Sequence, residues 1–188
     1  MNPLKQQLKA LVNFFEVAKI NYVILGGIAV SIYGEPRLTA DIDANIVLEN
    51  AQLENFLKIA KRYNFYPIPK NIKVFVKNTG VVPLRFVKGE GIKGQCDLII
   101  AKNIIEELAL KRARIRKIDS LKVRVVSPED LIIHKITAYR PRDLEDIRGI
   151  LMRQKEKLDI KYIEYWLGLI DKSAKQKGLL IKLFRDLL

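Results

Sequence analysis

Apolar residues recur at every third or fourth position near the start of the chain, and polar residues fill the positions between them. This period gives a helix one apolar face, so the sequence predicts an amphipathic helix over residues 3–19. Residues 22–25 form a short apolar run rich in β-formers, which predicts a buried strand. Two glycines follow, and no helix breaker occurs between Ile28 and Gly34, so we expect a short helix that begins at the glycine pair.

The pattern from residue 40 to residue 48 alternates strictly at its start, as expected of a strand with two different faces. One face carries isoleucine and alanine, and the other carries Asp41, Asp43 and Asn45. Residues two apart on a strand are separated by about 6 to 7 Å and point the same way. The pattern therefore places two carboxylates side by side.

The remaining segments mix the two periodicities. Residues 50–63 and 103–114 have the pattern of helices, and residues 95–100 and 121–126 have the pattern of strands. The even mixture of helical and strand-like segments predicts an α/β or α+β fold.

Two further β-forming runs, residues 74–76 and 81–87, are separated by turn residues and predict a hairpin. From Ser127 the pattern is helical, because Ser127 can cap a helix that begins with Pro128, and three more apolar stripes follow. We therefore expect a first domain over residues 1–126 and a helical C-terminal subdomain over residues 127–188 packed on it.

Composition bounds the class of protein. The chain has 188 residues, enough for one sizeable domain with a helical appendage. Its 34 Lys and Arg against 21 Asp and Glu give a net charge of +13, which favours a polyanionic partner such as a nucleoside triphosphate or RNA; the alternative is a basic surface that only maintains solubility. The single Cys96 excludes an internal disulfide and a zinc motif. No membrane span or signal peptide is evident, so we expect a cytoplasmic protein without membrane contact.

Candidate chemistry gathers around residues 25–43. A helix that begins at Gly26 and Gly27 would offer free N–H groups and a positive dipole end to a phosphate group. Asp41 and Asp43 on one strand face suit a pair of metal ions that bridge phosphates, and Mg²⁺ is expected because it prefers oxygen ligands. Taken separately, the glycine pair is usually a tight turn and the two aspartates a solvated face. Their order along the chain favours a nucleotide site.

The combined motif resembles the polymerase-β-type nucleotidyltransferase superfamily, most closely the minimal enzymes grouped with the AbiEii/AbiGii toxins. The resemblance rests on Gly26-Gly27, on the Tyr33-Gly34 helix end, and on a Pro-Arg-x-Thr turn. Asp41-Ile42-Asp43 completes it, with thirteen residues between Gly27 and Asp41. It extends over roughly residues 20–150. It implies a nucleotidyltransferase fold, with a small mixed sheet flanked by helices.

The resemblance also implies roles for further residues. Asp97, the only charged residue of its predicted strand, would be the third carboxylate and complete the metal site with Asp41 and Asp43. Its alternative is an aspartate exposed at a strand entrance. Lys135 would contact the triphosphate and pair with Asp146. The nucleotide-binding set would be Gly26, Gly27, Arg37, Thr39 and Lys135. His134 has no motif support, and we interpret it as an ordinary partly buried histidine.

The implied activity is Mg²⁺-dependent transfer of a nucleoside monophosphate from an NTP to a hydroxyl group. The family relation favours tRNA, another RNA or a protein as the acceptor, and implies a toxin–antitoxin component with an antitoxin partner. Two alternatives remain open. One is a non-catalytic RNA- or protein-binding module that keeps the fold, which the intact Asp41 and Asp43 oppose. The other is an aminoglycoside-type enzyme that modifies a small molecule.

Overall fold

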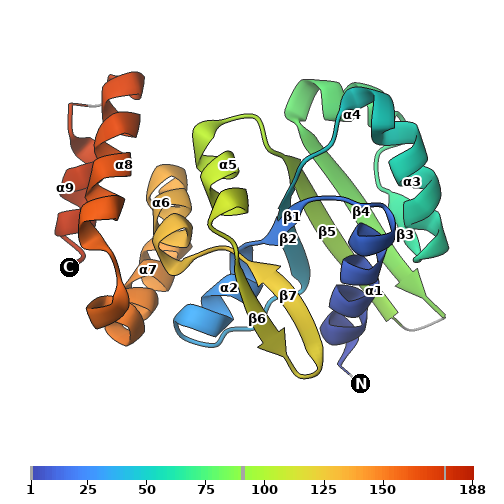
Figure 1. Cartoon of the computed structure of the whole chain (residues 1–188), viewed down its shortest axis with the longest axis horizontal. Coiled ribbons are helices and arrows are strands. Elements are labelled where there is room, and N and C mark those ends of the chain that lie inside the picture. Colours follow the sequence, from blue (N-terminus) through green and yellow to red (C-terminus); the bar gives the residue numbers. More distant parts are fainter. Residues whose placement is uncertain (1, 90–91, 176) are drawn as a thin grey trace.

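The computed structural model describes the whole chain except Met1, Glu90, Gly91 and Gln176. A seven-stranded mixed sheet forms its centre, in the order β3-β4-β5-β2-β1-β7-β6 (Figure 1). The strands are β1 (Tyr22–Ile24), β2 (Asp41–Ile46), β3 (Phe65–Pro67), β4 (Val81–Lys88), β5 (Ile92–Ile100), β6 (Arg114–Ile118) and β7 (Leu121–Val125). The pairs β2–β5 and β1–β7 are parallel, and the other pairs are antiparallel. The predicted α/β class with a mixed sheet is confirmed.

Helices surround this sheet. They are α1 (Pro3–Val17), α2 (Gly26–Tyr33), α3 (Leu53–Arg62), α4 (Ile72–Thr79), α5 (Ile104–Lys111), α6 (Pro128–Ala138), α7 (Pro141–Gln154), α8 (Ile160–Ala174) and α9 (Leu179–Arg185), with 3-10 turns at Asn50–Gln52 and Lys155–Lys157. Helices α6 to α9 stand together at one end of the molecule, on the left in Figure 1, and α1 lies toward the other end. None of the described helices is long and apolar enough to cross a membrane.

The two faces of the central strands have different partners. Ile42 of β2 and its register partner Cys96 of β5 are fully buried, and Gln7 of α1 donates a hydrogen bond to the Cys96 sulfur at 3.0 Å. Helix α1 therefore covers this face. Because side chains alternate along a strand, Asp43 and its register partner Asp97 point to the opposite face. That second face carries the candidate site.

Helix α6 begins as the sequence predicts. Ser127 caps it by accepting a hydrogen bond from the amide of Asp130, and Pro128 occupies the first turn. Tyr139 ends the helix in the left-handed conformation, with φ of +47°. Helix α6 packs on α2, α5 and α7, so it connects the sheet with the C-terminal helices.

The predicted hairpin of residues 74–76 with residues 81–87 is wrong in its first strand. Residues Ile72–Thr79 form α4, which Asn71 caps and which Gly80 ends with a φ of +71°. Val76 is buried but Val74 is 51% exposed, whereas a strand would place both on one face. Packing of one helical side therefore overrides the β preference of this run. Strand β4 pairs with β3 and β5 instead.

The helix predicted over residues 103–114 is also too long. It ends at Lys111, and Arg114–Ile118 forms the edge strand β6, paired with β7. Every second side chain of β6 is exposed, as expected of a strand at the edge of the sheet.

Candidate active site

Two of the three predicted carboxylates meet across adjacent parallel strands. Asp43 of β2 is the register partner of Asp97 of β5, and neighbouring strands lie about 4.8 Å apart. Asp41 is exposed at the first position of β2, opposite Gln95. Gln95 donates from its amide nitrogen to Asp97 at 3.2 Å. Asp43 and Asp97 thus form the half-buried part of the cluster and Asp41 its exposed edge.

The surroundings of the Asp43 carboxyl disfavour its charged form. Burial raises the pKa of the Asp43 carboxyl above its usual value, and the charges of Asp97 and Asp41 raise it further. The nearby cations of Lys135 and Arg37 oppose this shift without cancelling it. A group that is harder to ionise in the folded protein is one that a bound cation would stabilise.

The glycine pair permits close approach of the strand that carries the carboxylates. Gly26 has a φ of +58°, and a Cβ atom there would lie 1.9 Å from Oδ2 of Asp43. A Cβ atom at Gly27 would lie 2.6 Å from the side chain of Thr39. Helix α2 starts at Gly26, and no side chain caps its first turn. The predicted helix start is confirmed, and the Asp43 carboxylate lies directly against it.

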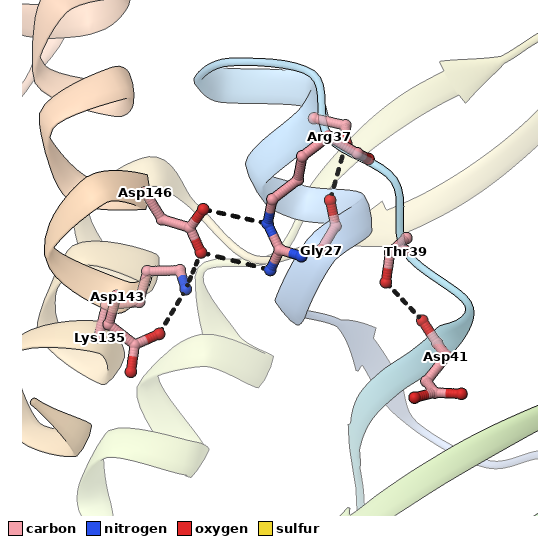
Figure 2. Close-up of polar contacts among 8 residues, drawn as sticks. Gly27, Arg37, Thr39, Asp41, Lys135, Asp143 and Asp146 are labelled. Carbon is pink, nitrogen blue, oxygen red and sulfur yellow. Dashed lines mark hydrogen bonds and ion pairs between the residues drawn. The ribbon is translucent and has the colours of Figure 1, made fainter. Parts of the chain in front are cut away.

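Thr39 holds the turn that leads into β2. Its hydroxyl donates to the carbonyl oxygen of Asp41 at 3.2 Å, and its side chain packs over Gly27 (Figure 2). Thr39 therefore links the backbone at Asp41 to the start of α2.

Arg37 and Lys135 are both held by carboxylates of α7. Arg37 makes two hydrogen bonds to Asp146, at 3.0 and 3.3 Å, and Lys135 contacts Asp146 at 2.7 Å and Asp143 at 2.8 Å (Figure 2). Lys135, Asp143 and Asp146 are largely buried. The predicted contact between Lys135 and Asp146 is present. Asp143 is a second partner of Lys135.

A cavity of about 340 Å³ lies beside the two carboxylates, between the sheet and α6. Its lining residues are Leu25, Gly26, Asp43, Asn45, Val81, Asp97, Ile99, Leu131, His134, Lys135, Ala138, Arg140 and Asp143. Four of the predicted or implied residues line the cavity: Gly26, Asp43, Asp97 and Lys135. Two others contact residues of the predicted site without lining the cavity. Arg37 bonds to Asp146, and Thr39 bonds to the backbone of Asp41.

Asn45 and His134 line this cavity, although neither was among the predicted site residues. Asn45 is fully buried, and neither its amide nitrogen nor its oxygen has a hydrogen-bond partner among the described residues. Nε2 of His134 is likewise buried without a partner there, and burial lowers the pKa of its imidazole. The alternation of β2 already placed Asn45 on the face of Asp41 and Asp43, so the signal existed for that residue.

The donor set fits Mg²⁺ in the way that nucleotide enzymes commonly hold it. In residues 2–89, 92–175 and 177–188, no group of three or more His, Cys, Asp or Glu side chains converges to enclose a metal ion. Mg²⁺ usually keeps several waters and binds through one or two carboxylates together with substrate phosphates. The paired oxygens of Asp43 and Asp97 and the raised pKa of Asp43 match that requirement.

Comparison with protein families defines the class. Residues 4–176 match the family described as nucleotidyl transferase of unknown function (DUF2204). The match spans nearly the whole chain, and the protein therefore belongs to this family of nucleotidyltransferases. The enzyme class predicted from the glycine pair and the aspartates is confirmed. No curated protein matches the sequence.

Solved structures share the fold at low sequence identity. A nucleotidyltransferase-like antigenic protein from Paracoccidioides brasiliensis superposes with a TM-score of 0.57 at 16% identity, over 95% of this chain and 92% of that one. The antibiotic-resistance factor ANT(2'')-Ia gives a TM-score of 0.62 at 14% identity, over 95% and 97% of the two chains. The lincosamide antibiotic adenylyltransferase LnuA gives 0.52 at 14%, over 78% and 94%. These similarities confirm the nucleotidyltransferase fold.

Proposed function

We propose that the protein transfers a nucleoside monophosphate from an NTP to a hydroxyl acceptor. Asp43 and Asp97 would hold Mg²⁺, and Asp41 would contact it from the exposed edge of the carboxylate cluster. The observation that carries this proposal is the register of Asp43 with Asp97 directly against the start of α2. The carboxylates that would bind the metal therefore lie next to the helix N-terminus that would bind the phosphates. Transfer of a nucleotidyl group requires both in one place.

Each side chain has a role in this proposal. The metal, when bound, would neutralise charge on the phosphate groups and orient them. Gly26 and Gly27 let the phosphates approach the helix start. Asp97 accepts the proton of the acceptor hydroxyl, whose oxygen bonds to the α-phosphorus while the bond to the β-phosphate oxygen breaks and pyrophosphate leaves. Lys135 and Arg37 supply positive charge beside the reacting phosphate.

The α7 carboxylates set where that positive charge lies. Asp146 accepts hydrogen bonds from both Arg37 and Lys135, and Asp143 accepts another from Lys135. Fixed, largely buried cations need little reorganisation when charge develops in the transition state. We therefore assign Asp143 and Asp146 as positioning residues for the two cations.

We propose RNA or a protein as the acceptor. The net charge of +13 favours RNA, which is a polyanion, and the resemblance to the toxin nucleotidyltransferases favours either acceptor. The finer placement with AbiEii/AbiGii toxins, a toxin–antitoxin role and an antitoxin partner stay predictions. Domain division at residue 126 and a cytoplasmic location also stay predictions.

A second candidate is modification of a small molecule. Two of the structures with this fold are described as an antibiotic-resistance factor and a lincosamide antibiotic adenylyltransferase, and this chain covers 97% and 94% of them. The size of the protein is thus the size of such enzymes.

An acceptor screen distinguishes the candidates. Purified protein is incubated with Mg²⁺ and each α-labelled NTP, together with total RNA, total protein, or a panel of aminoglycosides and lincosamides. We expect label in the RNA or protein fraction, and none with an Asp41→Ala/Asp43→Ala double variant. Label on a small molecule supports the second candidate. No transfer, together with no Mg²⁺-dependent NTP binding by calorimetry, would leave only a binding module.

A further inference from the structure

The cavity beside the carboxylates continues past them along β2. Asn45 lies two residues after Asp43 on the same strand face, a step of about 6.6 Å, and forms part of the cavity floor. Its side chain is fully buried, and its amide nitrogen and oxygen have no partner within the described part of the chain. An unpaired buried carboxamide is unfavourable for folding, so an apolar residue would suit the empty protein better at this position.

Apolar side chains and a second unpaired polar atom surround the cavity beside Asn45. Ile99 and Val81 from the sheet and Leu131 from α6 supply apolar lining to the cavity. His134 adds a second buried polar atom, Nε2, which also lacks a partner among the described residues. A cavity with apolar lining and a few unpaired polar groups is typical of a small-molecule or cofactor site, and the base of a nucleotide is a group of this kind.

We propose that this part of the cavity binds the base of the NTP, with the Asn45 carboxamide pairing with a base edge that presents a donor beside an acceptor. The inference rests on the proposed function, because it places the α-phosphate at Asp43 and Asp97. A ribose separates the α-phosphate from its base, and one two-residue step of β2 separates Asp43 from Asn45. Carboxamides pair bidentately with the amino edge of adenine in other complexes, so ATP is the first nucleotide to test.

The experiment compares affinities for ATP, GTP, CTP and UTP, measured by calorimetry with Mg²⁺. Inorganic tripolyphosphate with Mg²⁺ is the probe that lacks a base. The variant is Asn45→Leu, which keeps the approximate volume and removes the polar atoms. Asn55→Leu, exposed on α3, is the matched control.

We expect the wild type to favour one NTP over at least one other by about tenfold, the size of a bidentate base contact. Asn45→Leu should reduce that preference to within about twofold while its tripolyphosphate affinity and its melting temperature stay equal or rise. Asn55→Leu should leave both the NTP preference and the tripolyphosphate affinity unchanged. If Asn45→Leu does not fold, Ala138→Phe, which fills the cavity from the end of α6, replaces it and should weaken NTP binding but not tripolyphosphate binding.

Three results would overturn the base site. They are a wild type without NTP preference, a preference that survives Asn45→Leu, and an equal loss of NTP and tripolyphosphate binding in the cavity variants. A fourth result would also overturn the base site. If a nucleoside still binds when a non-hydrolysable NTP analogue saturates the protein, and if that binding requires Asn45, the cavity beside Asn45 holds the acceptor and not the base of the NTP. Absence of any Mg²⁺-dependent binding of NTP or tripolyphosphate instead identifies failure of the proposed function itself.

Discussion

Asp43 and Asp97 are register partners on the parallel strands β2 and β5, although 53 residues of sequence lie between them. Burial of Asp43 raises the pKa of its carboxyl, and the neighbouring charge of Asp97 raises it further. The fold thus maintains an arrangement that is unfavourable without a cation. Such strain is expected where a metal and a phosphate group bind.

The charge on Asp43 should destabilise the metal-free protein. Asp43→Asn removes the repulsion by Asp97 and Asp41 while keeping the shape, so we expect its unfolding free energy to rise by about 1 kcal/mol, or a few degrees of melting temperature. The measurement is thermal unfolding in EDTA near pH 7.5. Asp119→Asn, an exposed position, is the control.

The same comparison has a pH dependence with a definite sign. Because the folded-state pKa of Asp43 lies above its unfolded value, the penalty is present at high pH and is relieved as the pH falls through the raised pKa. The stability advantage of Asp43→Asn should therefore shrink as the pH is lowered. Added Mg²⁺ should raise the melting temperature of the wild type alone. An advantage for Asp43→Asn that is independent of pH and of Mg²⁺ would contradict this account.

Asp146 should be essential for stability as well as activity. Asp146→Ala leaves Arg37 without the partner that binds it at 3.0 Å and leaves Lys135 with Asp143 alone. Loss of one member of a buried ion cluster typically costs about 3 to 5 kcal/mol. Urea unfolding measures the change.

The matched control for Asp146 is Glu35→Ala. Glu35 also accepts from an arginine, Arg153, at 2.8 Å, but both side chains are about half exposed. Exposed pairs contribute about 0 to 1 kcal/mol, so this variant should unfold almost as the wild type does. Equal effects of the two substitutions would show that the Asp146 cluster is not buried as described.

Gly26 should tolerate no side chain. Gly26→Ala combines a left-handed φ with a Cβ atom placed 1.9 Å from Asp43, so we expect more than about 2 kcal/mol of destabilisation and loss of activity. Gly89→Ala shares the left-handed φ, +61°, but meets no atom within 4 Å. It should cost only about 1 kcal/mol and leave activity intact. If Gly26→Ala and Gly89→Ala had the same stability and activity, Asp43 would be able to move away from the helix start.

The sequence predicts the local part of this site well. The strand, glycine pair, helix, turn and second strand follow one another closely, so spacing and alternation predict the helix start at Gly26 and the common face of Asp41 and Asp43. Contacts between distant residues could not be derived in this way. Arg37 and Asp146 lie 109 positions apart, and their pairing depends on how α7 packs on α2. Helix α4 was missed because packing of Val76 outweighed the β preference of its neighbours.

The unpaired state of Asn45 also lies beyond sequence reasoning. Alternation places its side chain on the site face, but whether another residue satisfies its amide depends on which side chains of α5 and α6 reach it. Only the packed structure gives that information.

The central claim is that Asp43 and Asp97 together support transfer of a nucleotide. The most direct measurement is label transfer from α-labelled NTP, with Mg²⁺ and the full acceptor mixture, by wild type, Asp43→Asn, Asp97→Asn and the Asp119→Asn control. We expect transfer by the wild type and the control, and a loss of at least about 100-fold in Asp43→Asn and in Asp97→Asn. Transfer at wild-type rate by either Asp43→Asn or Asp97→Asn would contradict the central claim.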